Sequence, residues 1–268
     1  MARKKKLADK ADKHALYQES VQGVEFELDY VEKVFRETRA RRPHYLREDF
    51  CGTALSACEW AKRNRNNRSI GVDIDAAVLD WGRNHNLSPL GKAAAARVQL
   101  LQGDVLRVKC LPVDACLAFN FSYWVFQQRA TLKRYFKNVY RSLVDDGMFF
   151  LDTFGGYEAH RTQKERRALD GFTYVWDQAE YNAITGDMLC HIHFEFPDGS
   201  RLRKAFSYRW RLWSAQETRD LLKEVGFKRT TVHIQAFDEE TDEPLDEFYP
   251  TEEAEDYASW IGYIVAEK

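Results

Sequence analysis

The sequence predicts an α/β fold, in which a mostly parallel sheet is flanked by helices and a small antiparallel sheet is inserted late in the chain. Between His44 and Phe154, strand-like apolar segments alternate with segments of helical periodicity. A parallel sheet with right-handed crossovers uses that order economically. After Phe154, strand-like segments rich in aromatic residues are separated by turn signals, which indicates antiparallel pairing. The 268 residues suffice for one large domain with such an insertion.

The first two strands are expected to place a small-residue turn beside a carboxylate. The strand HYLRED leads into the turn Cys51-Gly52-Thr53, where Gly52 can adopt positive φ and lets the backbone approach a ligand. The next strand, RSIGVDI, ends in Asp73, 25 positions after Glu48. A carboxylate there can accept hydrogen bonds from both hydroxyl groups of a ribose, as in nucleotide-binding βαβ units. The spacing therefore predicts an adenosyl cofactor at the ends of two parallel strands.

This stretch resembles the first motif of the class I S-adenosylmethionine-dependent methyltransferases, an acidic residue followed by a glycine-rich turn. Glu48, Gly52 and Asp73 fall on its acid, its central glycine and its ribose-binding acid. Phe50 and Ala54 stand where the first and third glycines are usual. Phe50 is expected to avoid positive φ and to point its ring into the core. Some RNA methyltransferase families also have an aromatic residue at this place.

The resemblance implies a Rossmann-like sheet with S-adenosylmethionine as the cofactor, and it assigns further residues. Asp104 falls where the family binds the adenine amino group, with Val105 as an apolar cover for the ring. The fourth strand ends at the segment Asn120-Phe121-Ser122-Tyr123-Trp124, which lies beside the sulfonium in this fold. The expected cofactor-binding residues are Tyr17, Arg47, Glu48, Cys51, Gly52, Asp73, Ile74, Asp104, Val105, Asn120 and Phe121.

The candidate catalytic residues follow the fourth and fifth strands. We expect Asn120, Tyr123 and Tyr157 to act there, with Trp124 and Asp152 also within reach. A methyl group on a sulfonium is already electrophilic, so the protein mainly aligns the lone pair of the acceptor and excludes water. None of these residues stands alone as a catalytic base. That favours a nitrogen acceptor on a small molecule and leaves sulfur, oxygen and carbon acceptors open.

The inserted segment is expected to cover the acceptor. Its strands are predicted at FTYVWDQAEY, MLCHIHFEF and RLRKAFSYRWRLW, and a capping box at Ser214-Ala215-Gln216-Glu217 then opens a helix. This layout is similar to methyltransferases of small amines and related metabolites. A concentration of aromatic residues near the cofactor would also suit a cationic ligand.

We expect five segments along the chain. They are a disordered basic arm (1–13), an N-terminal lid and helix (14–43), the cofactor-binding core (44–154), the antiparallel insertion (155–213), and a C-terminal helix with the last two strands (214–268). These last two strands are expected near Lys228–Ala236 and Trp260–Ala266. Tyr17 is the candidate lid residue, with packing at the sheet edge as the other interpretation. Pro43 is expected to end the N-terminal helix. The acidic stretch DEETDEPLDEFYPTEEAED is predicted to be an exposed loop.

Composition narrows the functional classes. The net charge of −2 shows no bias toward nucleic acid, and no stretch approaches the roughly 20 apolar residues that cross a bilayer. Five cysteines without a CxxC motif indicate reduced thiols and a cytoplasmic location.

His191 and His193 lack a third metal ligand at suitable spacing, so no metal is expected. A set of alternating arginines is either a solvated face or a clamp for a carboxylate or phosphate: Arg201, Arg203, Arg209 and Arg211.

Two alternatives stay open, as does the oligomeric state. The basic arm and Phe50 are compatible with a methyltransferase of RNA or of a protein side chain, so nucleic acid remains an unfavoured alternative partner. The string NFSY that begins at Asn120 is similar to an NPPY-type motif but lacks both prolines. A binding protein that kept the fold and lost methyl transfer is the second alternative, which Phe50 alone supports.

Overall fold

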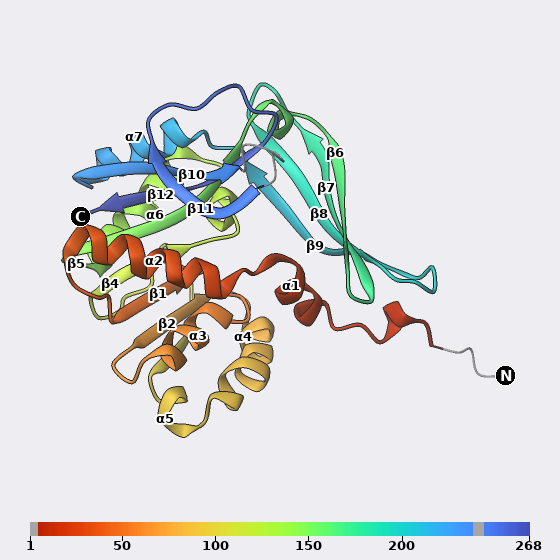
Figure 1. The fold of residues 1–268 in the computed structure, drawn as a ribbon, viewed down its shortest axis with the longest axis horizontal. Coiled ribbons are helices and arrows are strands. Elements are labelled where there is room, and N and C mark those ends of the chain that lie inside the picture. The colour runs from red at the N-terminus through yellow and green to blue at the C-terminus, as the bar shows by residue number, and fades with distance from the viewer. Residues whose placement is uncertain (1–4, 238–243) are drawn as a thin grey trace.

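Two sheets form the framework of the protein (Figure 1). The structure is a computed structural model and describes residues 5–237 and 244–268. The larger sheet has eight strands in the order β11-β10-β12-β5-β4-β1-β2-β3, and the smaller has four in the order β6-β7-β8-β9. The strands of the larger sheet are β1 (Tyr45–Asp49), β2 (Arg68–Asp73), β3 (Val98–Gln102), β4 (Val113–Ala118), β5 (Leu143–Gly155), β10 (Arg229–Phe237), β11 (Pro244–Thr251) and β12 (Trp260–Glu267). Those of the smaller sheet are β6 (Gln163–Leu169), β7 (Phe172–Tyr181), β8 (Asp187–Glu195) and β9 (Arg201–Arg211).

Helices cover both faces of the larger sheet. The α-helices are α1 (Lys13–Val21), α2 (Val24–Arg39), α3 (Leu55–Arg63), α4 (Ala76–Gly82), α5 (Lys92–Ala95), α6 (Arg129–Ser142) and α7 (Ala215–Val225). On one face, Leu28 of α2 and Trp60 of α3 belong to the same apolar cluster as Phe150 of β5. On the other face, Phe136 of α6 and Leu222 of α7 belong to a second cluster. Apolar burial on both faces holds the sheet between two helical layers.

The strand directions confirm the predicted α/β class. β1 to β5 pair in parallel, while β12 runs antiparallel to β5 and β10 antiparallel to β12. The carboxyl ends of β1, β2, β3 and β4 therefore meet at one edge of the sheet, which is where open α/β sheets bind ligands.

The inserted antiparallel sheet is also confirmed, with one strand more than predicted. The three predicted strands correspond to β7, β8 and β9, and β6 pairs antiparallel with β7 at the edge. The sequence QKERRAL of β6 has no alternation of apolar with polar residues. The alternation is missing because the side of this edge strand that faces inward lines a cavity with Gln163, Glu165 and Arg167, and the other side faces outward. The helix α1 packs against this sheet, where Leu16, Tyr17 and Val21 contact an apolar cluster that contains Ile192.

The prediction of an exposed acidic loop was wrong for part of its length. Residues 244–251 form β11, which pairs with β10 so that Tyr249 lies opposite Ile234. Phe248 provides the physical reason, because its ring packs against Phe26 of α2 and Tyr263 of β12 at centroid distances of 5.6 and 4.8 Å. The part of the predicted loop at 238–243 lies outside the described residues.

The N-terminal segment also differs from the expectation. Residues 5–13, predicted as part of a disordered arm, include a 3₁₀ helix at Leu7–Asp9. The backbone N–H groups of Leu7 and Ala8 donate to the side chains of Asp198 and Ser200 in the turn between β8 and β9. Hydrogen bonds to a distant turn order this segment although it buries little apolar surface. Residues 1–4 of the predicted arm lie outside the described residues.

The end of the N-terminal helix is set by backbone geometry rather than by proline. α2 ends at Arg39, and Ala40 adopts a left-handed conformation with φ of 52° as its C-cap. Pro43 lies in the extended segment that follows. A left-handed residue after the last turn is a common helix stop.

Candidate active site

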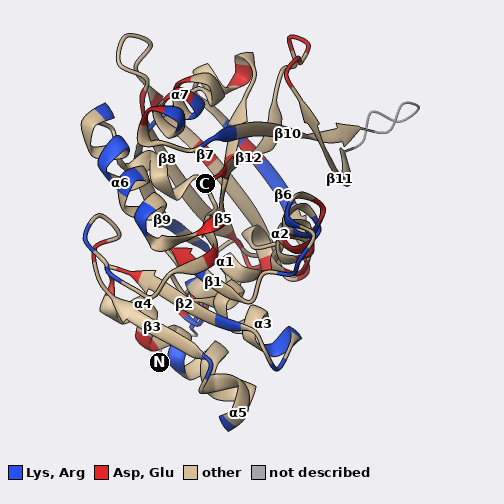
Figure 2. Ribbon diagram, turned by 90° about the vertical axis from the view of Figure 1, so that its left-hand side faces the viewer, with Lys and Arg blue, Asp and Glu red and all other residues tan. Residues whose placement is uncertain are grey.

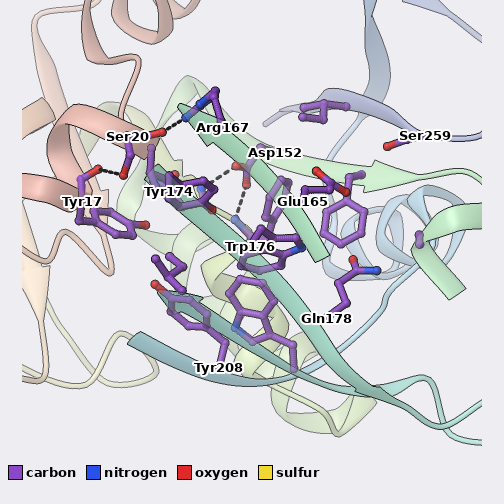
Figure 3. Close-up of a pocket in the computed structure, with 18 of the residues that line it drawn as sticks. Tyr17, Ser20, Asp152, Glu165, Arg167, Tyr174, Trp176, Gln178, Tyr208 and Ser259 are labelled. Carbon is purple, nitrogen blue, oxygen red and sulfur yellow. Dashed lines mark hydrogen bonds between the residues drawn. The ribbon is translucent and has the colours of Figure 1, made fainter. Parts of the chain in front are cut away.

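Two cavities meet at the carboxyl ends of the parallel strands. The first, which we name the strand-end cavity, has a volume of about 630 Å³ and lies over the ends of β1, β2 and β3. The second, the sheet-covered cavity, has a volume of about 340 Å³ and lies between the end of β5 and the smaller sheet (Figure 3). The residues common to both linings are Tyr17, Asn120, Tyr208 and Trp210. A group bound in one cavity can therefore approach a group bound in the other at this junction.

The strand-end cavity brings together most of the expected cofactor-binding residues. The expected residues that line it are Tyr17, Glu48, Cys51, Gly52, Asp73, Ile74, Asp104, Val105 and Asn120. Phe121 lines the sheet-covered cavity instead, and Arg47 lines neither.

The turn after β1 is tied to the end of β2. Gly52 has a φ of 51°, and its N–H donates to Oδ2 of Asp73 over 2.8 Å. Oδ1 of Asp73 accepts a second bond from the N–H of Asp75 over 2.9 Å. Two backbone donors thus fix the orientation of the Asp73 carboxylate, while each of its oxygens keeps a further lone pair for a ligand.

Glu48, on β1, lines the strand-end cavity and contacts the first turn of α3. Its Oε2 accepts a hydrogen bond from the N–H of Ala57 over 2.9 Å. Burial raises the pKa of Glu48 to about 8, although this hydrogen bond favours the ionised form.

The expectation that Phe50 avoids positive φ was wrong. Phe50 and Ala54 have φ values of 55° and 56°, so two non-glycine residues carry the left-handed conformations of this turn. Such conformations cost about 1–3 kcal/mol each. The ring of Phe50 packs against Phe126 and Tyr135 at centroid distances of 5.8 and 5.5 Å, and this contact offsets the strain. The inward position of the ring agrees with the prediction.

Arg47 belongs to the core rather than to the cofactor site, because side chains alternate along β1. Arg47 and Asp49 point to the face opposite Glu48. The Arg47 side chain is 0% exposed, and its Nε and Nη2 donate to the two oxygens of Asp49 over 2.7 and 2.9 Å. The hydroxyl of Tyr135 donates to the same carboxylate over 2.9 Å. A buried guanidinium needs such a partner, which β1 itself supplies.

The segment after β4 forms the junction between the cavities. Asn120 and Phe121 have φ values of 57° and 55°, and their N–H groups donate to Asp152 over 2.6 and 2.8 Å. Asp152, on β5, is only 8% exposed and lines the sheet-covered cavity. Burial raises the pKa of Asp152 to about 7, and the two N–H donors act in the opposite direction.

Two expected catalytic residues are placed away from the cavities. Beyond Phe121 the chain enters the 3₁₀ helix Ser122–Val125, which turns Tyr123 into the core, where it is 0% exposed and contacts Phe136. Trp124 is also fully buried. Tyr157 follows the end of β5 on another 3₁₀ helix and is 62% exposed. Neither tyrosine lines a cavity, so of the three expected catalytic residues only Asn120 lies at the junction.

The sheet-covered cavity combines aromatic walls with acidic groups. In Figure 3, Tyr17 and Ser20 lie at one side of it and Gln178 and Ser259 at the other. Its aromatic lining residues are Tyr17, Phe121, Phe154, Tyr174, Trp176, Tyr208, Trp210 and Tyr263, and its acidic ones are Glu27, Asp152 and Glu165. Arg167 also lines it, and its guanidinium donates to the carbonyl oxygen of Ser20.

Sequence reasoning missed Glu27, Glu165 and Arg167. For Glu27 a signal existed, because it shares a helical face with the buried residues Val24, Leu28 and Val31, and a carboxyl group on an apolar face is unusual. Glu165 and Arg167 lie on the strand that was not predicted.

The histidines and the alternating arginines singled out in the sequence lie outside the two cavities. His191 contacts Ser207 over 2.8 Å and His193 contacts Asp177 over 3.1 Å, in the sheet but outside both cavities. Over residues 5–237 and 244–268, no group of three or more His, Cys, Asp and Glu side chains is placed to hold a metal ion. The four alternating arginines line neither cavity. Two of them form ion pairs, Arg201 with Glu195 and Arg211 with Glu217.

The strand-end cavity has the size and chemistry for an adenosyl cofactor. Its volume lies within the range of about 300–1,000 Å³ that ligand sites occupy. The carboxylates of Asp73 and Asp104 stand after neighbouring strands, and Ile74, Val78 and Val105 provide apolar surface beside them. Hydroxyl groups and an amino group can bind the carboxylates, and a flat ring can lie on the apolar side chains.

Known proteins share this fold and part of this sequence. Residues 49–151 match the family model described as a methyltransferase domain. An S-adenosylmethionine-dependent methyltransferase from Clostridium acetobutylicum is similar in structure, with a TM-score of 0.68 at 16% identity, over 94% of this chain and 96% of that one. CalS10, an amino pentose methyltransferase from Micromonospora echinaspora solved with its cofactor bound, gives 0.66 at 14% identity, over 95% of both chains. The sugar N-methyltransferase KedS8 from Streptoalloteichus gives 0.63 at 15% identity, over 96% of this chain and 93% of that one.

One curated relative matches by sequence. It is a malonyl-[acyl-carrier protein] O-methyltransferase from Nitrosospira multiformis, 26% identical over 157 residues, which are 54% of this chain. The chain spans about half of the length of this relative.

Residues 49–151 thus match a methyltransferase domain, and the fold of the chain is shared with S-adenosylmethionine-dependent methyltransferases. In this chain an antiparallel sheet of four strands is inserted after β5. Over the residues that the structure describes, no helix has both the length and the apolar character to cross a membrane.

Proposed function

We propose that the protein transfers a methyl group from S-adenosylmethionine to an amine nitrogen of a small molecule held in the sheet-covered cavity. The observation that carries this proposal is the lining of that cavity. Aromatic faces attract ammonium groups, and the three carboxyl groups of the lining can ionise beside a cation. The one guanidinium in the lining is already bonded to a carbonyl oxygen.

The chain's own residues have distinct tasks in this reaction. When bound, the cofactor supplies a methyl group that is electrophilic because it is attached to a sulfonium. Asp73 would hold the ribose hydroxyls of the bound cofactor, and Asp104 would bind its adenine amino group. Tyr17 and Tyr208 close the junction against water, and Asn120 lies where donor and acceptor meet. Alignment and exclusion of water account for most of the rate enhancement that such a transfer needs.

The relatives point to two acceptor atoms. KedS8 is described as a sugar N-methyltransferase and the curated relative as an O-methyltransferase. A malonyl group carries a free carboxylate at neutral pH. Over the part of the chain that the structure describes, the lining of the sheet-covered cavity offers such a carboxylate no free cation, because its guanidinium group is bonded to the Ser20 carbonyl oxygen, and this supports the nitrogen acceptor.

A nucleic-acid acceptor finds less support. The net charge of the chain is −2, and in Figure 2 basic and acidic segments are both distributed over the face shown. Binding of a polyanion depends on a basic stripe. The small volume of the sheet-covered cavity also favours a free small molecule over a nucleotide within a chain. The five cysteines are free thiols, which supports a cytoplasmic location.

The experiment that tests this function measures incorporation of labelled methyl from S-adenosylmethionine into three acceptor pools. The first contains small amines, including amino sugars and amino alcohols, the second malonyl-acyl-carrier protein and the third total RNA. A reaction without protein is the blank, and Asp73→Ala should incorporate less label at low S-adenosylmethionine concentration because it lacks the ribose contact. We expect incorporation into the amine pool. Incorporation confined to the malonyl or RNA pool would overturn the nitrogen assignment.

A further inference from the structure

Glu27 is a buried carboxyl group that faces the sheet-covered cavity. It lies on the inward face of α2 and is only 9% exposed. Among the described residues, its carboxylate forms neither a hydrogen bond nor an ion pair, and it is part of the cavity lining. A carboxyl group that is buried without a partner is either protonated or becomes ionised when a cationic ligand binds beside it.

The groups around Glu27 do not neutralise it. Burial, followed by the carboxylates of Asp152 and Glu48, raises the pKa of Glu27 to about 8. The titratable and charged groups that face Glu27 or share its cavity are Asp152 of β5, Glu48 of β1, Tyr263 of β12, Tyr17 of α1, Glu165 and Arg167 of β6, Tyr174 of β7 and Tyr208 of β9. Arg167 is the only cation in this set, and it binds the Ser20 carbonyl oxygen.

Asp152 and Glu27 differ in a way that assigns them different tasks. Both oxygens of Asp152 accept backbone N–H bonds, which favour its ionised form and hold it in place. Glu27 has no such donors, so it can take up and release a proton without breaking a hydrogen bond. Two neighbouring carboxyl groups in unlike environments are a common basis for separate electrostatic and acid–base roles.

We propose that Glu27 is the general base of the methyl transfer, and this inference rests on the proposed function. An ammonium group enters the sheet-covered cavity and pairs with Asp152, and Glu27 gives its proton to solvent. An N–H bond of the ammonium group then breaks and the proton moves to the ionised carboxylate of Glu27, so the nitrogen keeps the electron pair. That pair forms the new bond to the methyl carbon, while the electrons of the carbon–sulfur bond remain on sulfur. The proton on Glu27 then passes to solvent as the product leaves.

A binding experiment tests the protonation of Glu27 without turnover. Benzylammonium chloride is titrated into the full-length protein at pH 7 in buffers of different ionisation enthalpy, which yields the number of protons released. Glu27 and Asp152, with pKa values raised to about 8 and about 7, both lose protons beside an ammonium group, so the wild type is expected to release protons from both. Glu27→Gln keeps the Asp152 contribution and should release about one proton less. Glu25→Gln, an exposed neighbour on α2, is the matched control and should behave as wild type.

A kinetic experiment tests the catalytic role with whichever amine the methyl-incorporation assay identifies. The wild-type kcat/KM should rise with pH through the pKa of Glu27, near pH 8. Glu27→Gln should lose this rise and about 10²- to 10⁴-fold in kcat. Glu27→Asp, which keeps the carboxyl group, should restore part of the rate and an altered pH profile. Cofactor affinity should stay within about twofold of wild type in both variants, which shows that they are folded.

The outcomes of these experiments distinguish failure of the general-base assignment from failure of the proposed function. If the wild type methylates amines and Glu27→Gln does so at the same rate with the same pH profile, the base role is overturned while the proposed function stands. If proton release is the same in wild type and Glu27→Gln, the assignment of the proton to Glu27 is overturned. If no amine is methylated by the wild type, the proposed function fails, and the base role fails with it.

Discussion

The backbone N–H of Gly52 and the carboxylate of Asp73 are joined by a 2.8 Å hydrogen bond that ties the turn after β1 to the end of β2. This bond joins two of the three residues on which the resemblance to the methyltransferase motif rests. Each parallel strand contributes one partner, and the register of β1 with β2 places Glu48 beside Gly71 and Asp49 beside Val72. The pairing of the strands thus brings the turn and the carboxylate to the same edge.

Asp73→Ala is expected to weaken cofactor binding. The substitution removes a charge-assisted contact to the ribose, a loss of about 1.5–3 kcal/mol, or roughly ten- to over a hundredfold in affinity. Isothermal titration calorimetry with S-adenosylmethionine measures it. Asp80→Ala, an exposed carboxylate on α4, is the control. Unchanged affinity in folded Asp73→Ala would show that the ribose is held elsewhere.

Trp176→Ala is expected to weaken binding of the methyl acceptor without changing the affinity for the cofactor. The ring lines the sheet-covered cavity but not the strand-end cavity. Losing its face removes about 0.5–2 kcal/mol of attraction for an ammonium group, which raises KM for an amine by roughly two- to thirtyfold. Steady-state kinetics and cofactor titration measure the two effects separately. Trp176→Phe keeps an aromatic face and should lose less. An equal KM in wild type and Trp176→Ala would place the amine outside this cavity.

Residues 14–24 are expected to become more protected from hydrogen exchange when the cofactor binds. The segment contains α1, whose Tyr17 lines both cavities and whose Gln18 donates to the Thr53 hydroxyl over 2.6 Å. Because these residues form part of the cavity wall, a ligand bound there adds contacts to the segment and lowers the population of its open state. Exchange mass spectrometry with and without S-adenosylmethionine tests this lid. Equal protection in both states would make Tyr17 a static packing residue.

The stability of the protein is expected to fall with rising pH in a way that depends on Glu27. Burial raises the pKa of Glu27 from its ordinary value of 4.5 to about 8 in the folded state. Between these values the folded state binds more protons than the unfolded state, so the free energy of unfolding decreases as pH rises, by up to about 1.4 kcal/mol per pH unit for this group.

Denaturant melts of wild type and Glu27→Gln between pH 5 and pH 8 measure that slope. All other titrating groups are common to the two proteins, so the difference in slope reports Glu27. The variant should lose less stability over this window. Parallel curves for the two proteins would mean that the folded state does not raise the pKa of this carboxyl group.

The features that the sequence by itself determined are formed by residues close together in the chain. The order of strands and helices, the turn at Gly52 and the carboxylate of Asp73 are local patterns, because a strand, a turn, a helix and the next strand repeat at short spacing. Phe50 adopts the left-handed conformation that glycine favours at such a turn, and its ring packs against Phe126.

Only the tertiary structure decided which side chains share a cavity. Asn120 and Tyr123 are three positions apart, yet left-handed conformations at Asn120 and Phe121 send one residue to the junction and the other into the core. Glu27 and Asp152 come from a helix and a strand that are far apart in the chain, and they meet because α2 packs on the larger sheet beside β5. Helical periodicity reveals that Glu27 lies on a buried face. It carries no information on what that face contacts, since contacts between distant segments depend on how whole elements pack.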